Sequence, residues 1–207
     1  NNGILLRTGR GSRATPIPQT FDLTWLKGWF IGAYLAEGSS NGYQTSISNL
    51  DDTYMARAQS FFEQQGLDPH EDIHHRGFAQ SRDLKVNSSL LSQFIAHSCG
   101  RGSRFKKVPH FAFSASDEFV SGLLRAYFDG DGNFHVQRKM IRVSSDSKEL
   151  LDGIALRLSR FKIFSFKTCD RKGQHWLLIP YKYAPLFLLS VGSDIPHKRA
   201  DLERLAL

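Results

Sequence analysis

The chain has 207 residues with 41% hydrophobic and 23% charged side chains, enough for one large domain or two smaller ones with separate cores. It contains no run of eighteen apolar residues and only two cysteines, without a C-x-x-C pair, which argues against a membrane span, a disulfide framework and a cysteine zinc site. Lys and Arg outnumber Asp and Glu by 27 to 20, and this net charge of +7 favours nucleic acid or an anionic membrane surface as partner.

Residues 1–21 are predicted to be an N-terminal arm. The segment carries arginines where a secretory signal would become apolar, so we expect a soluble intracellular protein, cytoplasmic or organellar, that is not secreted. Its GRGSR sequence is too short and too poorly placed for a dinucleotide-binding loop, and no small-molecule cofactor is expected.

Residues 22–95 are predicted to form the first of two repeats. The repeat opens with WLKGWFIGAYLAEGS, an apolar helical run that ends in an acid–glycine pair at Glu37. A polar alternating stretch typical of strands follows, and then ISNLDDTYMARAQSFFEQQGL, whose Ser/Asn/Asp-rich start suits a helix N-cap. A β-hairpin with Gly77 in its turn and a short closing helix complete the repeat. The predicted order is helix, two strands, helix, two strands, helix.

Residues 118–192 repeat this pattern after a basic linker at 96–117, and residues 193–207 are expected to be a C-terminal tail. The second acid-terminated helix is VSGLLRAYFDGDGN, in which Asp131 is equivalent to Glu37. A second N-capped helix, VSSDSKELLDGIALRLSRFKI, and a second hairpin follow in the same order. A duplication that only enlarges the core would explain the repeat but not its two acids.

The two acid-terminated helices carry small residues at every fourth position on one face. They are Gly28, Gly32 and Ala36 in the first helix and Gly122, Ala126 and Gly130 in the second. Because a mid-helix glycine costs roughly 1 kcal/mol relative to alanine, their recurrence indicates a close approach of two backbones. Packing these faces about a pseudo-twofold axis brings Glu37 and Asp131 to one end. A single acid–glycine pair is more typical of a solvent-facing C-cap, but two equivalent copies favour a shared site.

Two converging carboxylates at helix C-termini suit hard, oxygen-preferring cations such as Mg²⁺. Metal held there can activate water, neutralise charge on a phosphate and stabilise the leaving 3′ oxygen. The pattern therefore predicts metal-dependent phosphodiester hydrolysis.

The segments FIGAYLAEG (residues 30–38) and LRAYFDGDG (residues 124–132) resemble the two motifs of the LAGLIDADG homing endonucleases. The resemblance extends over residues 22–200. It implies an α+β fold of two pseudo-symmetric αββαββα repeats, whose antiparallel sheets form a saddle-shaped surface for DNA.

The resemblance also implies the metal site. It assigns metal binding and catalysis to Glu37 and Asp131, and includes the preceding residues Ala36 and Gly130 in the metal site. Mg²⁺ is the expected ion, and Mn²⁺ or Ca²⁺ is expected to substitute for it. Asp129 matches a position that is usually not a ligand.

Family members place a basic residue near each active centre, ahead of the last helix of a repeat. Lys182 matches that position in the second repeat. The first repeat departs from the pattern, since it offers Asn87 to Ser89 there and leaves Lys85 as a substitute. This departure predicts that one strand is cut more slowly than the other.

Polar strand and hairpin residues are predicted to contact DNA, because alternate residues of a half-buried strand face away from the helices. In the first repeat they are Gln44, Ser46, Ser48, His75, Arg76, Gln80 and Arg82. In the second repeat they are His135, Gln137, Arg138, Lys139, Arg142, Ser144, Lys167, Arg171, Lys172 and Gln174. Arg pairs with guanine and Gln with adenine in the major groove, whereas most hairpin residues are expected to contact phosphate. The linker cations, Lys106 among them, are expected either to contact phosphate or to aid solubility.

The predicted function is cleavage of double-stranded DNA at a long, near-palindromic or asymmetric target by a monomer that needs divalent metal. The alternative is an RNA maturase or DNA-binding regulator that keeps the fold without cutting, although both acids are intact. Intron-encoded and intein-encoded origins both remain open, since no splicing motifs are evident in the sequence.

Overall fold

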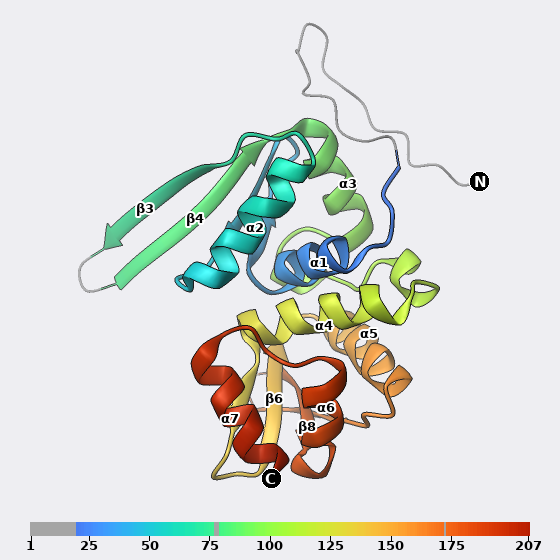
Figure 1. Ribbon diagram of the computed structural model, residues 1–207. Helices are drawn as coiled ribbons and strands as arrows, with labels where there is room; N and C mark the ends of the chain where they lie inside the picture. The colour runs from blue at the N-terminus through green and yellow to red at the C-terminus, as the bar shows by residue number, and fades with distance from the viewer. Residues whose placement is uncertain (1–19, 77–78, 172) are drawn as a thin grey trace, which may run out of the picture.

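Two similar halves lie on either side of a packed helix pair, α1 (Trp25–Glu37) and α4 (Asp117–Asp131), in the computed structural model (Figure 1). The structure describes residues 20–76, 79–171 and 173–207, and only the backbone at 74–76 and 79. Predictions on residues 1–19, on Gly77, on Lys172 and on the side chains of His75 and Arg76 lie outside the described residues. Within the described part, no helix is long and apolar enough to cross a membrane.

The first half has the predicted order of elements. It contains α1, β1 (Gly38–Ser40), β2 (Gln44–Ser48), α2 (Asp52–Gln64), β3 (His70–Arg76), β4 (Ala79–Asn87) and α3 (Ser89–Cys99). Each helix begins at a polar side chain that accepts a hydrogen bond from a main-chain N–H of its first turn: Thr24, Asp51 and Ser88.

The second half repeats this order. It contains α4, β5 (Asn133–His135), β6 (Met140–Ser145), α5 (Lys148–Arg160), β7 (Phe166–Cys169), β8 (His175–Pro180) and α6 (Ala184–Ser190). The short 3-10 turns η1 (Ser103–Phe105) and η2 (His110–Phe113) lie between the halves, and η3 (Tyr181–Tyr183) precedes α6. The expected fold class is therefore confirmed.

The small residues of α1 and α4 line the interface between the halves. A Cβ atom at Gly32 would lie 2.0 Å from the carbonyl oxygen of Leu123, and one at Gly122 would lie 2.3 Å from that of Trp25. No side chain fits at such distances, so only glycine allows these two backbones to touch. This contact places the C-terminal ends of α1 and α4 beside each other.

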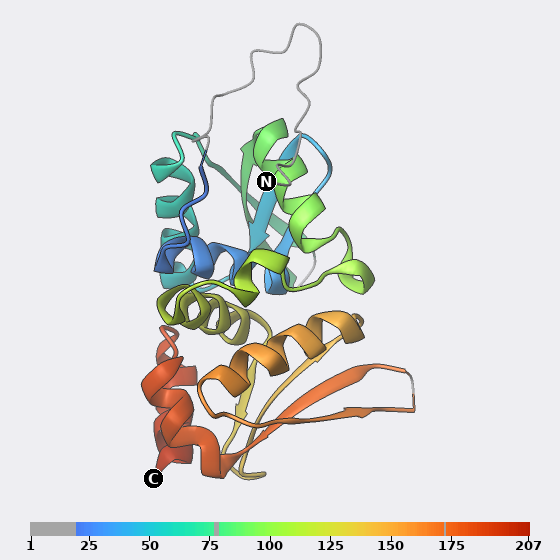
Figure 2. The same cartoon turned by 90° about the vertical axis from the view of Figure 1, so that its right-hand side faces the viewer.

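Each half forms one antiparallel sheet, with strand orders β1-β2-β4-β3 and β5-β6-β8-β7. Figure 2 shows the two halves, each with its sheet, above and below the α1–α4 pair. Ile47 and Leu84 of the first sheet, and Val143 and Leu177 of the second, are buried on the side covered by helices. Since strand residues alternate, their neighbours lie on the opposite side, which we call the open face.

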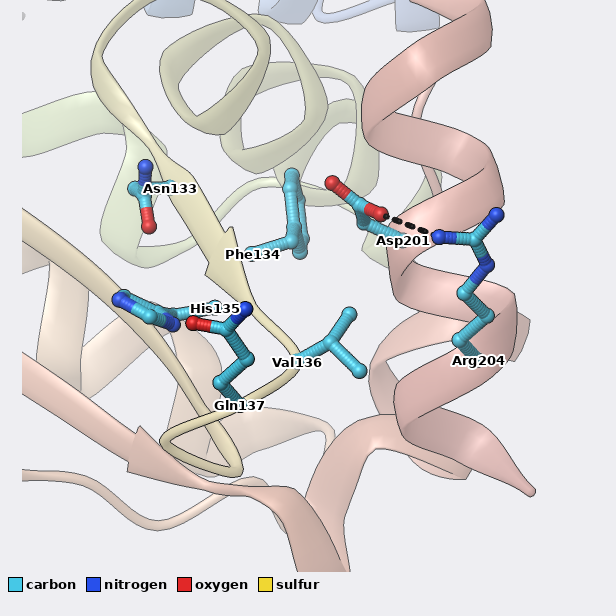
Figure 3. A pocket seen from close by; sticks show the side chains of 7 residues that line it. All are labelled: Asn133, Phe134, His135, Val136, Gln137, Asp201 and Arg204. Carbon is cyan, nitrogen blue, oxygen red and sulfur yellow. Dashed lines mark hydrogen bonds and ion pairs between the residues drawn. The ribbon is translucent and has the colours of Figure 1, made fainter.

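The C-terminal segment departs from the prediction, because residues 193–207 include a helix, α7 (Pro196–Ala206), rather than only a tail. Proline suits the first turn of a helix, and Leu202 and Leu205 are buried beneath α7. The helix lies against the edge strand β5 and borders a hollow of about 380 Å³ (Figure 3). That hollow is lined by Asn133, Phe134, His135, Val136, Gln137, Asp201 and Arg204. Helix α7 thus shields the edge of the second sheet.

Candidate active site

The two predicted acids occupy equivalent places at the ends of the packed helices. Glu37 is the last residue of α1, and Asp131 is the last residue of α4. A glycine follows each acid, and its N–H closes the helix on the carbonyl of Tyr34 or Phe128. A Cβ atom at Gly130 would lie 3.0 Å from Cγ of Glu37, so the Glu37 side chain reaches across to the end of α4.

The carboxylate of Asp131 acts electrostatically on that of Glu37. Burial raises the pKa of Glu37 to about 7, and repulsion from Asp131 adds to the shift, while Lys106 and Lys198 oppose it. Crowding by protein atoms also raises the pKa of Asp131, against the same two lysines, although one side of this residue remains open to solvent. Two adjacent carboxylates repel each other when both are ionised, and a cation bound between them would remove that repulsion.

Lys106 lies beside the end of α1. Its side chain is buried, and Nζ donates a hydrogen bond to the Ala36 carbonyl at 3.3 Å. Burial lowers the pKa of Lys106, whereas Asp131 and Glu37 raise it. The ammonium group therefore faces both acids from the linker between the halves.

Lys198 has the corresponding place at the end of α4. Its Nζ donates to the carbonyls of Phe128 at 3.3 Å, Asp129 at 2.6 Å and Gly130 at 3.1 Å. Burial lowers its pKa, and the carboxylates of Asp129 and Asp131 oppose that shift. Ala36 and Gly130 precede the two acids, so each motif ends with an acid, a main-chain carbonyl and a lysine that follows the last helix of the same repeat.

Asp129 has a structural environment. The residue is 1% exposed, and it accepts hydrogen bonds from the Ser193 hydroxyl and from the Asp194 main-chain N–H, the latter at 3.0 Å. Burial raises its pKa to about 6. These contacts fasten the segment that leads into α7, and through it the position of Lys198.

The two lysines expected from the family pattern are not brought to the acids. The ammonium group of Lys182 lies over the Tyr183 ring, 5.0 Å from its centre, because β8 carries the chain away from the acid end before η3 begins. Lys85 is bound on the first sheet, with Nζ 2.7 Å from Asp72 Oδ2 and 3.6 Å from Asp83 Oδ2. This corrects the two assignments, and Lys106 and Lys198 are the cations beside the acids.

In the sequence, Lys106 is one of several basic linker residues and Lys198 lies in the predicted C-terminal tail, so neither was predicted to be at the site. The sequence does contain a local signal, because two similar tripeptides occur beside the lysines. The tripeptide VPH (residues 108–110) follows Lys106 and Lys107, and IPH (residues 195–197) precedes Lys198. Each tripeptide follows the last helix of its repeat. The signal alone does not show that these segments return to the ends of α1 and α4.

The strand registers place most of the predicted DNA-contacting residues on the open faces. Gln44, Ser46 and Ser48 share one face of β2, and Arg142 and Ser144 share the matching face of β6. His135 lies on that face of β5, opposite Met140. Gln137, Arg138 and Lys139 form the exposed turn after β5, and Gln80 and Arg171 are exposed on the two hairpins.

Two predicted contacts are corrected by the register. Arg82 lies on the helix side of β4 and forms ion pairs with Glu71 and with Asp52 of α2. Lys167 lies on the helix side of β7 and forms an ion pair with Asp152 of α5. A shift of one residue along a strand moves each side chain to the other face of the sheet. The polar sequence pattern alone therefore placed Arg82 and Lys167 on the wrong face.

A pocket of about 270 Å³ opens beside Asp131. It is lined by Leu35, Ala36, Ser103, Lys106, Asp131, Ser144, Ser145, Asp146 and Gln174. The pocket joins the acid end of the helices to the open face of the second sheet. Among the described residues, no cluster of three or more His, Cys, Asp or Glu side chains is present, so the candidate metal site rests on the two carboxylates and their flanking carbonyls.

Comparison with known proteins agrees with this arrangement. Residues 118–182 match the sequence model of the LAGLIDADG-like domain. The crystal structure of I-DmoI in complex with DNA and Ca is 14% identical, has a TM-score of 0.66 and covers 87% of this chain and 98% of that chain. The homing endonuclease I-WcaI bound to its DNA recognition sequence is 12% identical, with a TM-score of 0.62 and coverage of 87% and 88%.

Similar segments also occur in curated proteins. The chain is 46% identical over 189 residues to DNA-directed RNA polymerase subunit Rpo1C of Methanocaldococcus jannaschii, covering 91% of this chain and 22% of that protein. It is 37% identical over 135 residues to a probable translation initiation factor IF-2 of the same organism, covering 62% and 12%. The chain therefore spans less than a quarter of these relatives. The predicted resemblance is confirmed: the second repeat carries a LAGLIDADG-like domain, and the chain has the fold of the LAGLIDADG homing endonucleases.

Proposed function

We propose that this protein is a site-specific endonuclease that hydrolyses double-stranded DNA with divalent metal bound by Glu37 and Asp131. The observation that carries the proposal is the duplicated end of the two central helices. There, two carboxylates face each other, each with a neighbouring main-chain carbonyl and a lysine.

The residues present fit a hard divalent cation. Both side-chain donors are carboxylates, and the carbonyls of Ala36 and Gly130 supply further oxygen. A dication between the acids would relieve the repulsion from Asp131, which adds to the effect of burial on the pKa of Glu37. Mg²⁺ is the proposed ion, with Mn²⁺ or Ca²⁺ as substitutes. When bound, it would polarise a scissile phosphate and lower the pKa of a water molecule.

The chain's own residues then have separable roles. Glu37 and Asp131 hold negative charge on either side of the pseudo-twofold axis. Lys106 and Lys198 place an ammonium group near each carboxylate, where it offsets negative charge on phosphate oxygens. Because each repeat supplies its own lysine, we do not expect one strand to be cut more slowly for lack of a lysine in the first repeat.

We further propose that the chain belongs to an intein-type insertion. Similar segments lie inside an RNA polymerase subunit, a translation initiation factor and an aminotransferase, which share no activity. The segment covers 22% of the polymerase subunit, and 12% each of the initiation factor and the aminotransferase. A segment shared by unrelated proteins and contained in their polypeptides is best explained as an insert that is translated with its host.

Selective cleavage of DNA tests the proposed function. The wild type would be incubated with a randomised duplex library and Mg²⁺, beside the uninterrupted coding sequence of the polymerase subunit. We expect the wild type to cut both strands at one sequence. Glu37→Gln and Asp131→Asn should each lose cleavage of both strands and still bind DNA. Glu118→Gln is the matched control, because Glu118 is exposed at the opposite end of α4.

The result separates the proposal from its alternatives. Full cleavage by either acid variant overturns the metal assignment. Sequence-specific capture of duplex DNA or RNA without cutting, by a folded wild-type protein with Mg²⁺ or Mn²⁺, would indicate a regulator or maturase instead.

A further inference from the structure

On the open face of the second sheet, the three side chains of β8 are apolar: Trp176, Leu178 and Pro180. The register places Asn133, Arg142, Leu178 and Phe166 in one line across its four strands. Phe166 is 53% exposed, and the neighbouring positions on this face include Met140 and Pro180. Apolar side chains exposed beside an arginine suit a partner that offers both apolar and polar groups.

Arg142 is the cation within this face, and it is stacked rather than paired. Its guanidinium lies 5.2 Å from the centre of the Trp176 ring. Its Nε atom is buried without a hydrogen-bond acceptor, and within the described residues the group makes no ion pair. Other partly buried arginines, such as Arg57 and Arg125, are bound to Asp194. Arg142 is therefore held in position with its donor capacity largely unused.

The first sheet has different residues at the same positions. Ser46 corresponds to Arg142, because each lies opposite the second residue after its acid. By the same register, His70 corresponds to Phe166, Lys85 to Leu178, and Asp83 to Trp176. The first face is therefore polar and carries carboxylates, so the apolar surface is not a requirement of the fold.

We propose that the open face of the second sheet reads a guanine next to thymine methyl groups in the major groove of the DNA target. This inference rests on the proposed function, since it assigns sequence preference to a surface that adjoins the proposed cleavage site. The pocket beside Asp131 includes Ser144 and Gln174, and Ser144 lies opposite Trp176 in the sheet. The face and the acids thus form one continuous surface.

The chemistry of the base edges matches the two parts of this face. Guanine presents two acceptors, N7 and O6, which a planar guanidinium binds together, and stacking on Trp176 fixes the plane of the group. Among the four bases only thymine adds a methyl group to the major groove, which apolar side chains contact. Leu178 supplies such a side chain on the neighbouring strand β8, and Phe166 supplies another two strands from Arg142.

Removing single methyl groups from the DNA tests the apolar part. Each thymine of a selected target would be replaced by deoxyuridine, and binding measured by competition. For the wild type, we expect about fourfold weaker binding at one or more positions in one half-site. Phe166→Ser should abolish this loss. His70→Ser, the matched change in the first sheet, should leave it intact.

Changing the arginine tests the polar part. Site selection with Arg142→Gln should lower the preference for guanine at one position by about tenfold or more, and shift it towards adenine. Ser46→Ala, at the equivalent position of the first sheet, should leave the guanine preference at that position unchanged. Preferences in the other half-site should remain unchanged, and thermal unfolding would verify that both variants fold.

The outcomes distinguish this inference from the proposed function. A folded wild type that selects no duplex overturns both. A wild type that cuts one sequence, but whose preferences are unaffected by Arg142→Gln and whose binding is insensitive to deoxyuridine, overturns this inference alone. Altered self-association in Phe166→Ser with an unchanged base profile would assign the face to a protein partner and also overturn it.

Discussion

The two repeats agree where their central helices meet and differ where their sheets face outward. At the helix ends, both halves supply an acid, a main-chain carbonyl and a lysine. On the open faces, the first half carries Asp83 and Lys85 where the second has Trp176 and Leu178. The two repeats are thus alike where they meet at the pseudo-twofold axis and differ on the surfaces that face away from it.

A second difference lies in how each lysine is held. Lys106 donates to one carbonyl, whereas Lys198 donates to three and is supported by the Asp129–Ser193 contact. Asp194 also binds Arg57 of the first half and Arg125 of the second. The C-terminal segment therefore joins both halves. The first half has no carboxylate that could hold the linker of Lys106 in the same way, since Leu35 of α1 stands where α4 has Asp129.

The largest expected effect comes from breaking what the halves share. Gly32→Ala and Gly122→Ala each place a Cβ within 2.3 Å of a main-chain oxygen of the other central helix. Either change should lower the free energy of unfolding by about 3 kcal/mol, despite the higher helix propensity of alanine. Urea unfolding would measure the loss, with Glu118→Ala as the control. Wild-type stability in either glycine variant would contradict the close helix contact.

Removing the lysines should reveal the difference in their support. Lys198→Met leaves three helix-end carbonyls without their ammonium donor, whereas Lys106→Met leaves one. We expect Lys198→Met to lose about 1–2 kcal/mol more stability than Lys106→Met. Both variants should cut DNA more slowly, as measured in single-turnover assays. Equal stability of the two would show that the carbonyl contacts add little to the fold.

Sequence periodicity was sufficient for the scaffold, because each helix and hairpin is encoded locally and occurs twice. The four-residue spacing of Gly28 and Gly32 predicted the contact between the two helices. That contact in turn predicted that Glu37 and Asp131 lie side by side. Lys198 was not predictable in this way, since its place depends on how α7 folds back on α4. Arg82 and Lys167 were assigned to the wrong face of their sheets. The face on which a side chain lies depends on the strand register, and a run of polar residues in an exposed hairpin does not define that register.

Titration of Glu37 should distinguish the two acids. Its pKa is raised to about 7, above the ordinary value of 4.5, so the folded state binds more protons than the unfolded state between these values. Without metal, stability should therefore fall as pH rises from about 4.5 to 7. Glu37→Gln should remove this dependence and stabilise the metal-free protein at pH 8 by on the order of 1 kcal/mol after solvent screening.

Cleavage should show the opposite pH dependence to stability. Metal binding needs the charged carboxylate, so at limiting Mg²⁺ the rate should fall as pH drops below about 7. Glu37→Asp is the informative variant, since it keeps the charge with a shorter side chain. A cleavage rate that is independent of pH between 6 and 8 at limiting metal would contradict the role of Glu37 as a ligand.

The smallest effects are expected from the two basic residues on the helix sides of the sheets. Arg82 is engaged by Glu71 and Asp52, and Lys167 by Asp152, so neither is available to DNA. Arg82→Ala and Lys167→Ala should each weaken DNA binding by less than about threefold, and stability by under about 1 kcal/mol, because these ion pairs are largely exposed. Lys139→Ala, in the exposed turn after β5, should weaken binding more and reduce its salt dependence. A larger loss from Arg82→Ala than from Lys139→Ala would mean that DNA reaches the helix side of the first hairpin, and that the two open faces are not the whole binding surface.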